Sequence, residues 1–101
     1  MQIKKPVKKN IQLEEIFKIL GTKTNFRIVY LLFKVGCLPL DDIARVFKIS
    51  QACASNHLTK LIDHGILIEK FKNKNYFYSL NAKNKKLLKL KNIFLIPHND
   101  L

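Results

Sequence analysis

The residues that could do the most chemistry are short polar side chains that recur along one predicted helix, 51–64. Gln51, Ser55 and Asn56 fall on one face of that helix, together with the small Ala52. Amide and hydroxyl groups donate and accept hydrogen bonds, and short side chains let a helix approach its partner closely. This combination is typical of a helix that enters the major groove of DNA, where every base pair presents donors and acceptors.

The sequence contains no comparable set of residues for catalysis. The chain has seven acidic residues, and it shows no paired carboxylates, Ser/His/Asp combination or glycine-rich phosphate loop. A structural hydrogen bond is the ordinary role for His57, and His64 is expected to support the C-terminal dipole of its helix. His98 with Asp100 is a weak candidate for adventitious metal binding. The sequence therefore predicts a binding protein that is not an enzyme and holds no cofactor.

The spacing of apolar residues predicts the elements that must position these side chains. Ser50 is a suitable N-cap for the helix 51–64, and Ala54, Leu58 and Leu61 form its buried stripe. Further helices follow from the same periodicity, and a change to alternation predicts a hairpin with asparagines in its turn. The helices are expected at about 11–20, 24–35, 39–47 and 82–95, and the hairpin at 66–80 with its turn at 72–75.

This order of elements predicts the fold class: mostly α with a β-hairpin, a winged helix-turn-helix of order α-α-α-α-β-β-α. With 101 residues, we expect a single domain over 10–96, a basic flexible N-terminal arm over 1–9 and a C-terminal tail over 97–101. The most apolar stretch, 26–40, contains two basic residues and is too short to span a bilayer. No secretory signal is recognised, so we expect a cytoplasmic protein without a membrane partner.

The charge of the chain is strongly positive and unevenly distributed. The formal net charge is +12, and the segment 70–91 holds eight lysines and no acidic residue. Such a field attracts polyanions. Two other readings stay open: a lysine-rich composition that reflects an AT-rich genome, and an ordinary solvated face. The side chains expected to contact the DNA backbone around the helix and at the hairpin tip are Lys48, Lys60, Lys72, Asn73 and Lys74.

The segment from Ile49 to Leu67 resembles the recognition-helix signature of the ArsR/SmtB group of winged-helix repressors. The shared pattern is Ser-Gln, small residues, Ser, His-Leu, a further Leu and a terminal glycine. The resemblance extends upstream to 24–32 and downstream to 76–80, so it covers most of residues 11–81. It implies a wing at 70–76 and a dimer formed by the first and last helices. The base contacts that it implies are Gln51, Ala52, Ser55 and Asn56, next to the cap Ser50.

The metal-ligand motifs of that group are missing from this sequence. Metal-sensing members carry paired cysteines in the third helix, and the matching positions here are Pro39 and Asp41, neither of which supplies a thiolate. Members that sense through the last helix use His with Asp or Glu, whereas residues 82–95 contain none of these. The sequence therefore predicts a regulator without a metal site, which binds DNA constitutively or responds to another inducer.

The dimer that the resemblance implies has independent support from the two terminal helices. Both are richer in Leu, Ile and Phe than a solvent-facing end helix in so small a domain requires. The residues predicted at the dimer interface are Leu13, Ile16, Phe17, Leu20, Leu87, Leu90, Ile93 and Phe94.

Two cysteines, Cys37 and Cys53, are too few for a disulfide scaffold and are not expected to pair. Cys37 is expected at a junction between helices, as a small buried hydrophobic residue or as a redox-sensing thiol. Cys53 falls on the helix 51–64, where it is a tolerated small residue or a thiol whose oxidation would disturb DNA contact.

Taken together, the sequence predicts a sequence-specific, double-stranded DNA-binding transcriptional regulator: a homodimeric repressor that binds an inverted repeat. Two alternatives remain: a winged-helix adaptor that docks on an acidic protein, and a nonspecific nucleic-acid-binding protein that depends on lysine charge alone.

Overall fold

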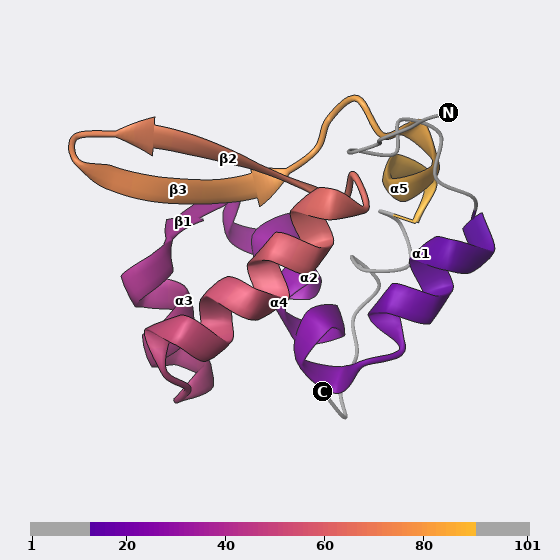
Figure 1. Cartoon of the computed structure of the whole chain (residues 1–101). Coiled ribbons are helices and arrows are strands. Elements are labelled where there is room, and N and C mark those ends of the chain that lie inside the picture. Colours follow the sequence, from indigo (N-terminus) through magenta and orange to yellow (C-terminus); the bar gives the residue numbers. More distant parts are fainter. Residues whose placement is uncertain (1–12, 91–101) are drawn as a thin grey trace, which may run out of the picture.

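The computed structural model describes residues 13–90, which form a helical body with a three-stranded sheet along one side (Figure 1). The helices in this range are α1 (Leu13–Leu20), α2 (Lys23–Val35), α3 (Leu40–Phe47), α4 (Gln51–Asp63) and α5 (Lys85–Lys89). The strands are β1 (Cys37–Pro39), β2 (Leu67–Lys72) and β3 (Asn75–Leu80).

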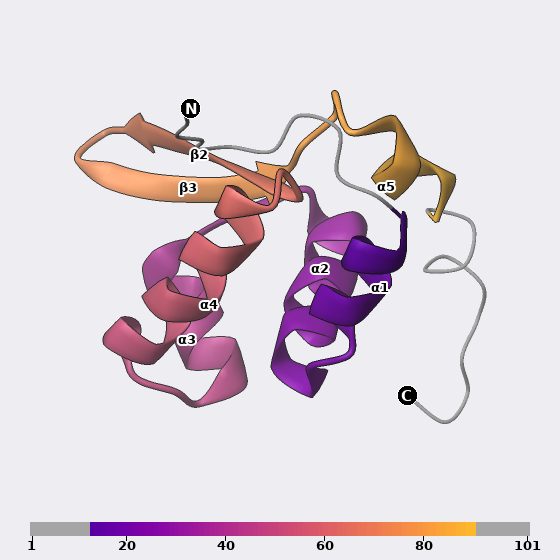
Figure 2. The same ribbon diagram turned by 45° about the vertical axis from the view of Figure 1, so that its right-hand side comes forward.

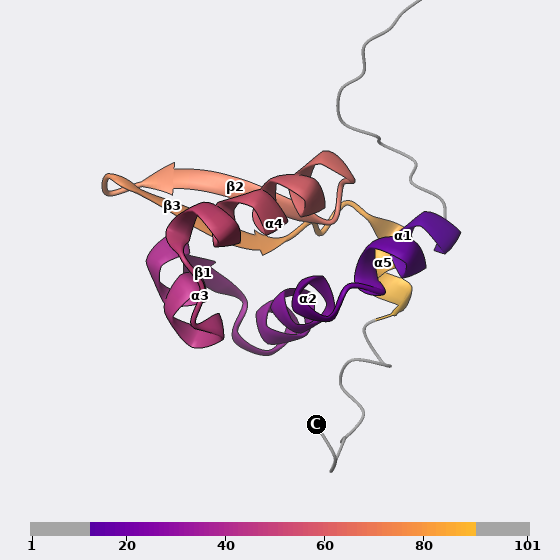
Figure 3. The same ribbon diagram turned by 60° about the horizontal axis from the view of Figure 1, so that its bottom comes forward.

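The helices pack around one hydrophobic core. Figure 2 shows α1 beside α2 and α3 beside α4, with the sheet crossing one end of both pairs. In Figure 3, α5 lies against α1 at the end of the molecule opposite the hairpin tip. Burial of the apolar side chains in this core supplies the main driving force for folding. The largest fully buried side chains are Ile16, Ile28, Val29, Leu32, Ile43, Leu58, Leu61, Ile66, Leu67 and Leu87.

Strands β2 and β3 form the predicted hairpin. Lys72 pairs with Asn75, and the two residues between them, Asn73 and Lys74, have φ angles of 52° and 66°. Positive φ at both central positions defines a type I′ turn, whose twist matches that of the flanking strands. The prediction that asparagine would serve in this turn is confirmed for Asn73. Lys74 adopts the same backbone conformation without the usual preference of asparagine or glycine for it.

A third strand, β1, was not predicted from the sequence. It pairs antiparallel with β3, so that Cys37 lies opposite Ser79 and Pro39 opposite Phe77, and the strand order is β1-β3-β2. Three residues are too few to display an alternating pattern, and their partners lie about forty residues further along the chain. Pro39 then serves as N-cap of α3 rather than as its first residue.

The last helix begins later than the sequence predicts. Asn84 caps α5 by accepting a hydrogen bond from the Leu87 N–H at 3.0 Å, so the helix starts at Lys85 instead of residue 82. The same Asn84 side chain donates to the Gly65 carbonyl at 3.0 Å, which fixes α5 to the turn after α4. The remainder of the predicted helix, from residue 91, lies outside the described residues.

The fold class, mostly helical with a β-hairpin, is confirmed. The arm predicted over 1–9 and the tail predicted over 97–101 fall outside the described residues. No helix within 13–90 is long and apolar enough to cross a membrane.

Candidate nucleic-acid interface

A tight turn joins α3 to α4 and sets where α4 begins. Lys48 ends α3 with a φ of 55°, and its N–H bonds back to the carbonyls of Ala44 and Arg45. Ser50 then adopts an extended conformation, and its Oγ accepts a hydrogen bond from the Cys53 N–H at 3.0 Å. The predicted cap is confirmed. It satisfies one of the N–H groups that have no partner at a helix start.

The two faces of α4 are sharply different. Ala54, Leu58 and Leu61 are buried against the core. The opposite face carries the residues predicted to read DNA, and it is open to solvent in this chain. Gln51, Ala52, Asn56 and Lys60 are exposed, as are the flanking Lys48 and Ser50, whereas Ser55 is half-buried.

Gln51, at the start of α4, has a partner that the sequence did not indicate. Its Nε2 donates a hydrogen bond to Oδ1 of Asp41, in the first turn of α3. Since Asp41 engages the amino group, the side-chain amide is held in one orientation, which leaves its carbonyl oxygen as the free acceptor. Asp41 is therefore a candidate positioning residue for Gln51.

A buried polar bridge ties α4 to the first two helices. Asn25, which is 4% exposed, donates from Nδ2 to the Ile19 carbonyl at 3.2 Å. Its Oδ1 lies 2.9 Å from Nδ1 of His57 on α4, and because the amide oxygen only accepts, His57 carries a proton on Nδ1. The structural hydrogen bond expected for His57 is confirmed. The role of Asn25 was missed, since its partner is distant in sequence.

The hairpin projects from the helical body (Figure 1), and the sequence at its tip is basic. The predicted contact residues Lys72, Asn73 and Lys74 are all exposed, and Lys70 is exposed on the same strand face as Lys72. In Figures 1 and 3, the hairpin tip and the N-terminal end of α4 lie toward the same side of the molecule. The structure thus brings the two predicted groups of DNA-contact residues to one side.

The acidic residues near this surface are engaged by neighbouring side chains. Asp42 forms an ion pair with Arg45 at 2.7 Å. Glu69 accepts a hydrogen bond from the Tyr78 hydroxyl at 2.8 Å. Burial, followed by this hydrogen bond to the carboxylate, raises the pKa of Tyr78 well above its usual 10.0. Residues 70–76, at the end of the hairpin, are basic, neutral or aromatic, so this segment carries no negative charge.

The residues predicted at a dimer interface divide into two groups. Ile16, Leu20, Leu87 and Leu90 are at most 8% exposed and fill the core of the single chain, so they have almost no surface left for a second chain. Phe17, by contrast, is 54% exposed on α1. The side chain of Leu13, and the whole of Ile93 and Phe94, lie outside the described part. The apolar faces of α1 and α5 are thus explained by packing within the core of their own chain, where α1 contacts both α2 and α5.

One of the two cysteines occupies a different environment from the one expected. Cys37 is exposed on β1, not buried at a junction between helices, because β1 lies at the edge of the sheet. Cys53 is half-buried on α4, and both thiols are free. Among residues 13–90, no three His, Cys, Asp or Glu side chains gather in a way that could hold a metal ion.

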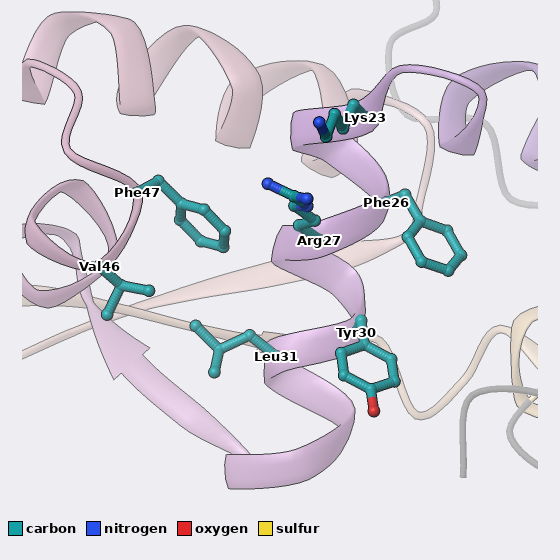
Figure 4. Close-up of a pocket in the computed structure, with 7 residues that line it drawn as sticks. All are labelled: Lys23, Phe26, Arg27, Tyr30, Leu31, Val46 and Phe47. Atoms are coloured by element: carbon teal, nitrogen blue, oxygen red, sulfur yellow. The ribbon is translucent and has the colours of Figure 1, made fainter. Parts of the chain in front are cut away.

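A separate hollow of about 490 Å³ lies between α2 and the end of α3. Figure 4 shows Arg27 and Leu31 pointing from α2 toward Val46 and Phe47 of α3, with Lys23 at one end of the hollow. None of its lining residues belongs to the predicted DNA-contact set, so it is distinct from the surface formed by α4 and the hairpin.

Comparison with known proteins finds a family and relatives of similar sequence. The model of the MarR family matches residues 22–75. A cadmium resistance transcriptional regulatory protein CadC homologue from Staphylococcus aureus is 35% identical over 74 residues, which are 73% of this chain and 61% of that relative. The arsenical resistance operon repressor of Escherichia coli (strain K12) is 34% identical over 67 residues, which are 66% of this chain and 57% of that relative. The chain thus spans about three fifths of the length of the curated relatives that it matches.

A solved structure of a transcriptional repressor has a similar fold. The crystal structure of the AntR antimony-specific transcriptional repressor superposes with a TM-score of 0.70 and 25% identity, covering 82% of this chain and 73% of that one. The expectation of a winged helix is confirmed by this likeness together with the order of elements.

Proposed function

This chain belongs to the MarR family, and we propose that it is a sequence-specific DNA-binding transcriptional repressor that acts as a homodimer. One observation carries the proposal. The N-terminal end of α4, where Gln51 and Ala52 are exposed, and the tip of the β2–β3 hairpin, where Lys72 and Lys74 are exposed, lie toward the same side of the molecule (Figure 1). A duplex on that side can receive the helix in its major groove while the hairpin reaches the adjacent backbone.

The exposed face of α4 supplies the groups needed for base readout. Amide side chains such as those of Gln51 and Asn56 form paired hydrogen bonds with adenine, and Ala52 suits contact with a thymine methyl. The hydrogen bond that Gln51 donates to Asp41 orients the Gln51 amide before DNA arrives. A fixed side chain loses less entropy on binding, so this contact is proposed to favour selectivity.

The backbone of the hairpin turn supports a role for Lys74. A lysine at φ 66° is strained by roughly 1 kcal/mol or more, and glycine would relieve that strain. Local strain of this kind is a feature of functional positions. We take Lys74 to be a phosphate contact, together with Lys72 and Asn73.

Within the family, we place the chain with the ArsR/SmtB-type repressors, as the names of its relatives and the segment 49–67 suggest. We further propose that it works without a metal ion and without catalysis. Pro39 and Asp41 stand where the group carries thiolates, and neither provides one. Phe17, exposed on α1, is the described residue that we assign to the dimer interface. We also propose a cytoplasmic location, because the chain would meet genomic DNA there.

Selection of binding sites from a random pool of duplexes tests the proposal directly. We expect an inverted repeat whose half-sites lie about one helical turn apart. The double variant Gln51→Ala/Asn56→Ala is expected to lose preference for the selected site while it keeps binding to random duplex. Equal affinity for random and selected duplexes from the start would instead indicate a nonspecific coat protein. A double variant that keeps full function would indicate a protein adaptor.

Salt dependence and metal addition complete the test. If the dimer makes about 6–10 phosphate contacts, the logarithm of the binding constant falls with the logarithm of salt concentration with a slope of about −5 to −9. A nearly flat dependence contradicts the proposed lysine contacts. Zinc, cadmium and arsenite are expected to leave the complex intact, and release of the duplex by any of them contradicts the metal-independent mechanism.

A further inference from the structure

The hollow between α2 and α3 exists because these two helices do not pack closely against each other. α2 packs against α1, α4 and the strands β1 and β3, whereas α3 packs against α4 and the same two strands. Direct packing between α2 and α3 is sparse by comparison. The space left between them measures about 490 Å³ and is open to solvent on one side.

The hollow has a cationic end and an apolar end. Lys23, Arg27 and Leu31 follow one another four residues apart, so they form a row along one side of α2. In Figure 4, this row faces the last turn of α3, where Val46 and Phe47 line the apolar end. Lys23 stands at the opposite end. With a rise of about 1.5 Å per residue, the row is about 12 Å long, which matches about two turns of another helix.

The cationic end has no counter-charge among the described residues. Within 13–90, neither Lys23 nor Arg27 has an acidic partner, and none of the residues that line the hollow is acidic. The acids of α3, Asp41 and Asp42, bond to side chains that do not line the hollow. A partner that complements this surface therefore carries negative charge near the start of α2 and apolar groups near the end of α3.

The open shape of the hollow favours a protein segment over a small molecule. A pocket for a small molecule usually buries about 70–90% of the ligand surface. Here Val46 is 55% exposed, and Lys23 and Arg27 are exposed as well, so a small ligand would keep much of its surface in water. An amphipathic helix in a groove needs to bury only one face, through apolar side chains three or four residues apart.

We propose that the hollow between α2 and α3 docks a short amphipathic helix of another protein. Its acidic side chains lie against Lys23 and Arg27, and its apolar side chains pack against the last turn of α3. This inference goes beyond the proposed DNA binding and does not depend on it. Because no lining residue belongs to the predicted DNA-contact set, the helix and a duplex can occupy the same chain at once. A bound partner is then carried to the DNA.

The probes are peptides selected on the full-length chain from a display library of short amphipathic helices with one randomised face. We expect the enriched peptides to carry Asp or Glu in one turn and Leu, Ile or Phe in the next turns, at a spacing of three or four residues. The Kd of a labelled peptide for the chain and for each variant is then measured by fluorescence anisotropy.

Three variants locate the peptide on the chain. Val46→Gln keeps a good helix former at an exposed position but removes an apolar contact, so it is expected to weaken peptide binding about tenfold at unchanged Tm. Lys23→Glu/Arg27→Glu is expected to weaken it about tenfold or more, and a peptide with lysines in place of its acidic residues is expected to restore affinity for this variant. Lys85→Glu/Lys89→Glu makes the same charge change at the same spacing on exposed positions of α5. It is the matched control and is expected to bind the original peptide nearly as tightly as the wild type.

Several results would overturn the inference. If no peptide is enriched, or if Val46→Gln and the charge-reversed variant bind the peptide as the wild type does, the hollow is not its site. Displacement of the peptide by a duplex would place it on α4 or the hairpin. A change of oligomeric state in Val46→Gln, measured by sedimentation, would mean that a second copy of the chain occupies the hollow. Peptide binding that meets these expectations while no duplex is selected would support the docking site and contradict the proposed function, so the two failures are distinguishable.

Discussion

Replacement of Asn25 by alanine is expected to separate the stability of the fold from recognition of DNA. Asn25 is 4% exposed and bonds both to the Ile19 carbonyl and to Nδ1 of His57. The variant removes two hydrogen bonds worth about 1 kcal/mol each, and it leaves two partly buried groups without partners at a further cost of about 1 kcal/mol or more. The expected loss is about 2–4 kcal/mol in the free energy of unfolding.

A loss of that size is a large part of the stability of a domain this small, which is typically about 5–15 kcal/mol. It corresponds to a fall in Tm on the order of 10–20 °C. Urea unfolding followed by far-ultraviolet circular dichroism measures the change. The matched control is Asn56→Ala, because Asn56 is the same residue type on the exposed face of α4. It is expected to shift stability by less than about 0.5 kcal/mol and to alter only DNA preference.

A double-mutant cycle with His57→Ala tests whether the bridge acts as one unit. The two single changes remove the same bond, so together they are expected to cost less than their sum by about 1 kcal/mol. Additive effects would refute the reasoning, as would an Asn25→Ala protein that unfolds at the wild-type urea concentration. Either result would mean that water satisfies the groups that Asn25 joins.

Three further changes have defined outcomes. Ser50→Ala removes the cap that accepts from the Cys53 N–H, and is expected to lower the free energy of unfolding by about 1 kcal/mol and to speed exchange of that amide. Lys74→Gly relieves backbone strain, so it is expected to raise the free energy of unfolding in urea by about 1 kcal/mol and to weaken duplex binding. A variant that is more stable and also binds the duplex more tightly would exclude the phosphate contact. Burial and the hydrogen bond to Glu69 raise the pKa of Tyr78, so the unfolded chain releases the hydroxyl proton at a lower pH than the folded chain does. The free energy of unfolding is therefore expected to fall as pH rises above 10. Denaturation of the wild type and Tyr78→Phe at pH 9 and 11 measures this, and the variant is expected to lack the fall that Tyr78 causes.

The local features of the fold could be read from neighbouring residues. Ser50 caps α4, the stripe of Ala54, Leu58 and Leu61 is buried, and Asn73 adopts positive φ in the hairpin turn, all as predicted. Each of these depends on side chains within a few positions of each other. Helical periodicity and turn chemistry are properties of such short windows, so the sequence displays them directly.

The partners that bury α1 and α5 could not be predicted from the sequence. An apolar stripe indicates that a face will be buried, but it does not indicate what will bury it. Ile16 and Leu87 were predicted to pack against a partner subunit. They lie instead in the core of their own chain, where α1 and α5 are in contact. The exposed Phe17 was in the same predicted group, and only its position in the packed structure separates it from the others.

By itself, the sequence determined the order of helices and hairpin, the polar face of α4 and the basic character of the wing. Only the tertiary structure decided which distant residues meet: β1 with β3, Asn25 with His57, and Asp41 with Gln51. The physical reason is that these contacts join residues ten or more positions apart, and their geometry depends on how whole elements pack. A pattern within one element carries no information about that packing.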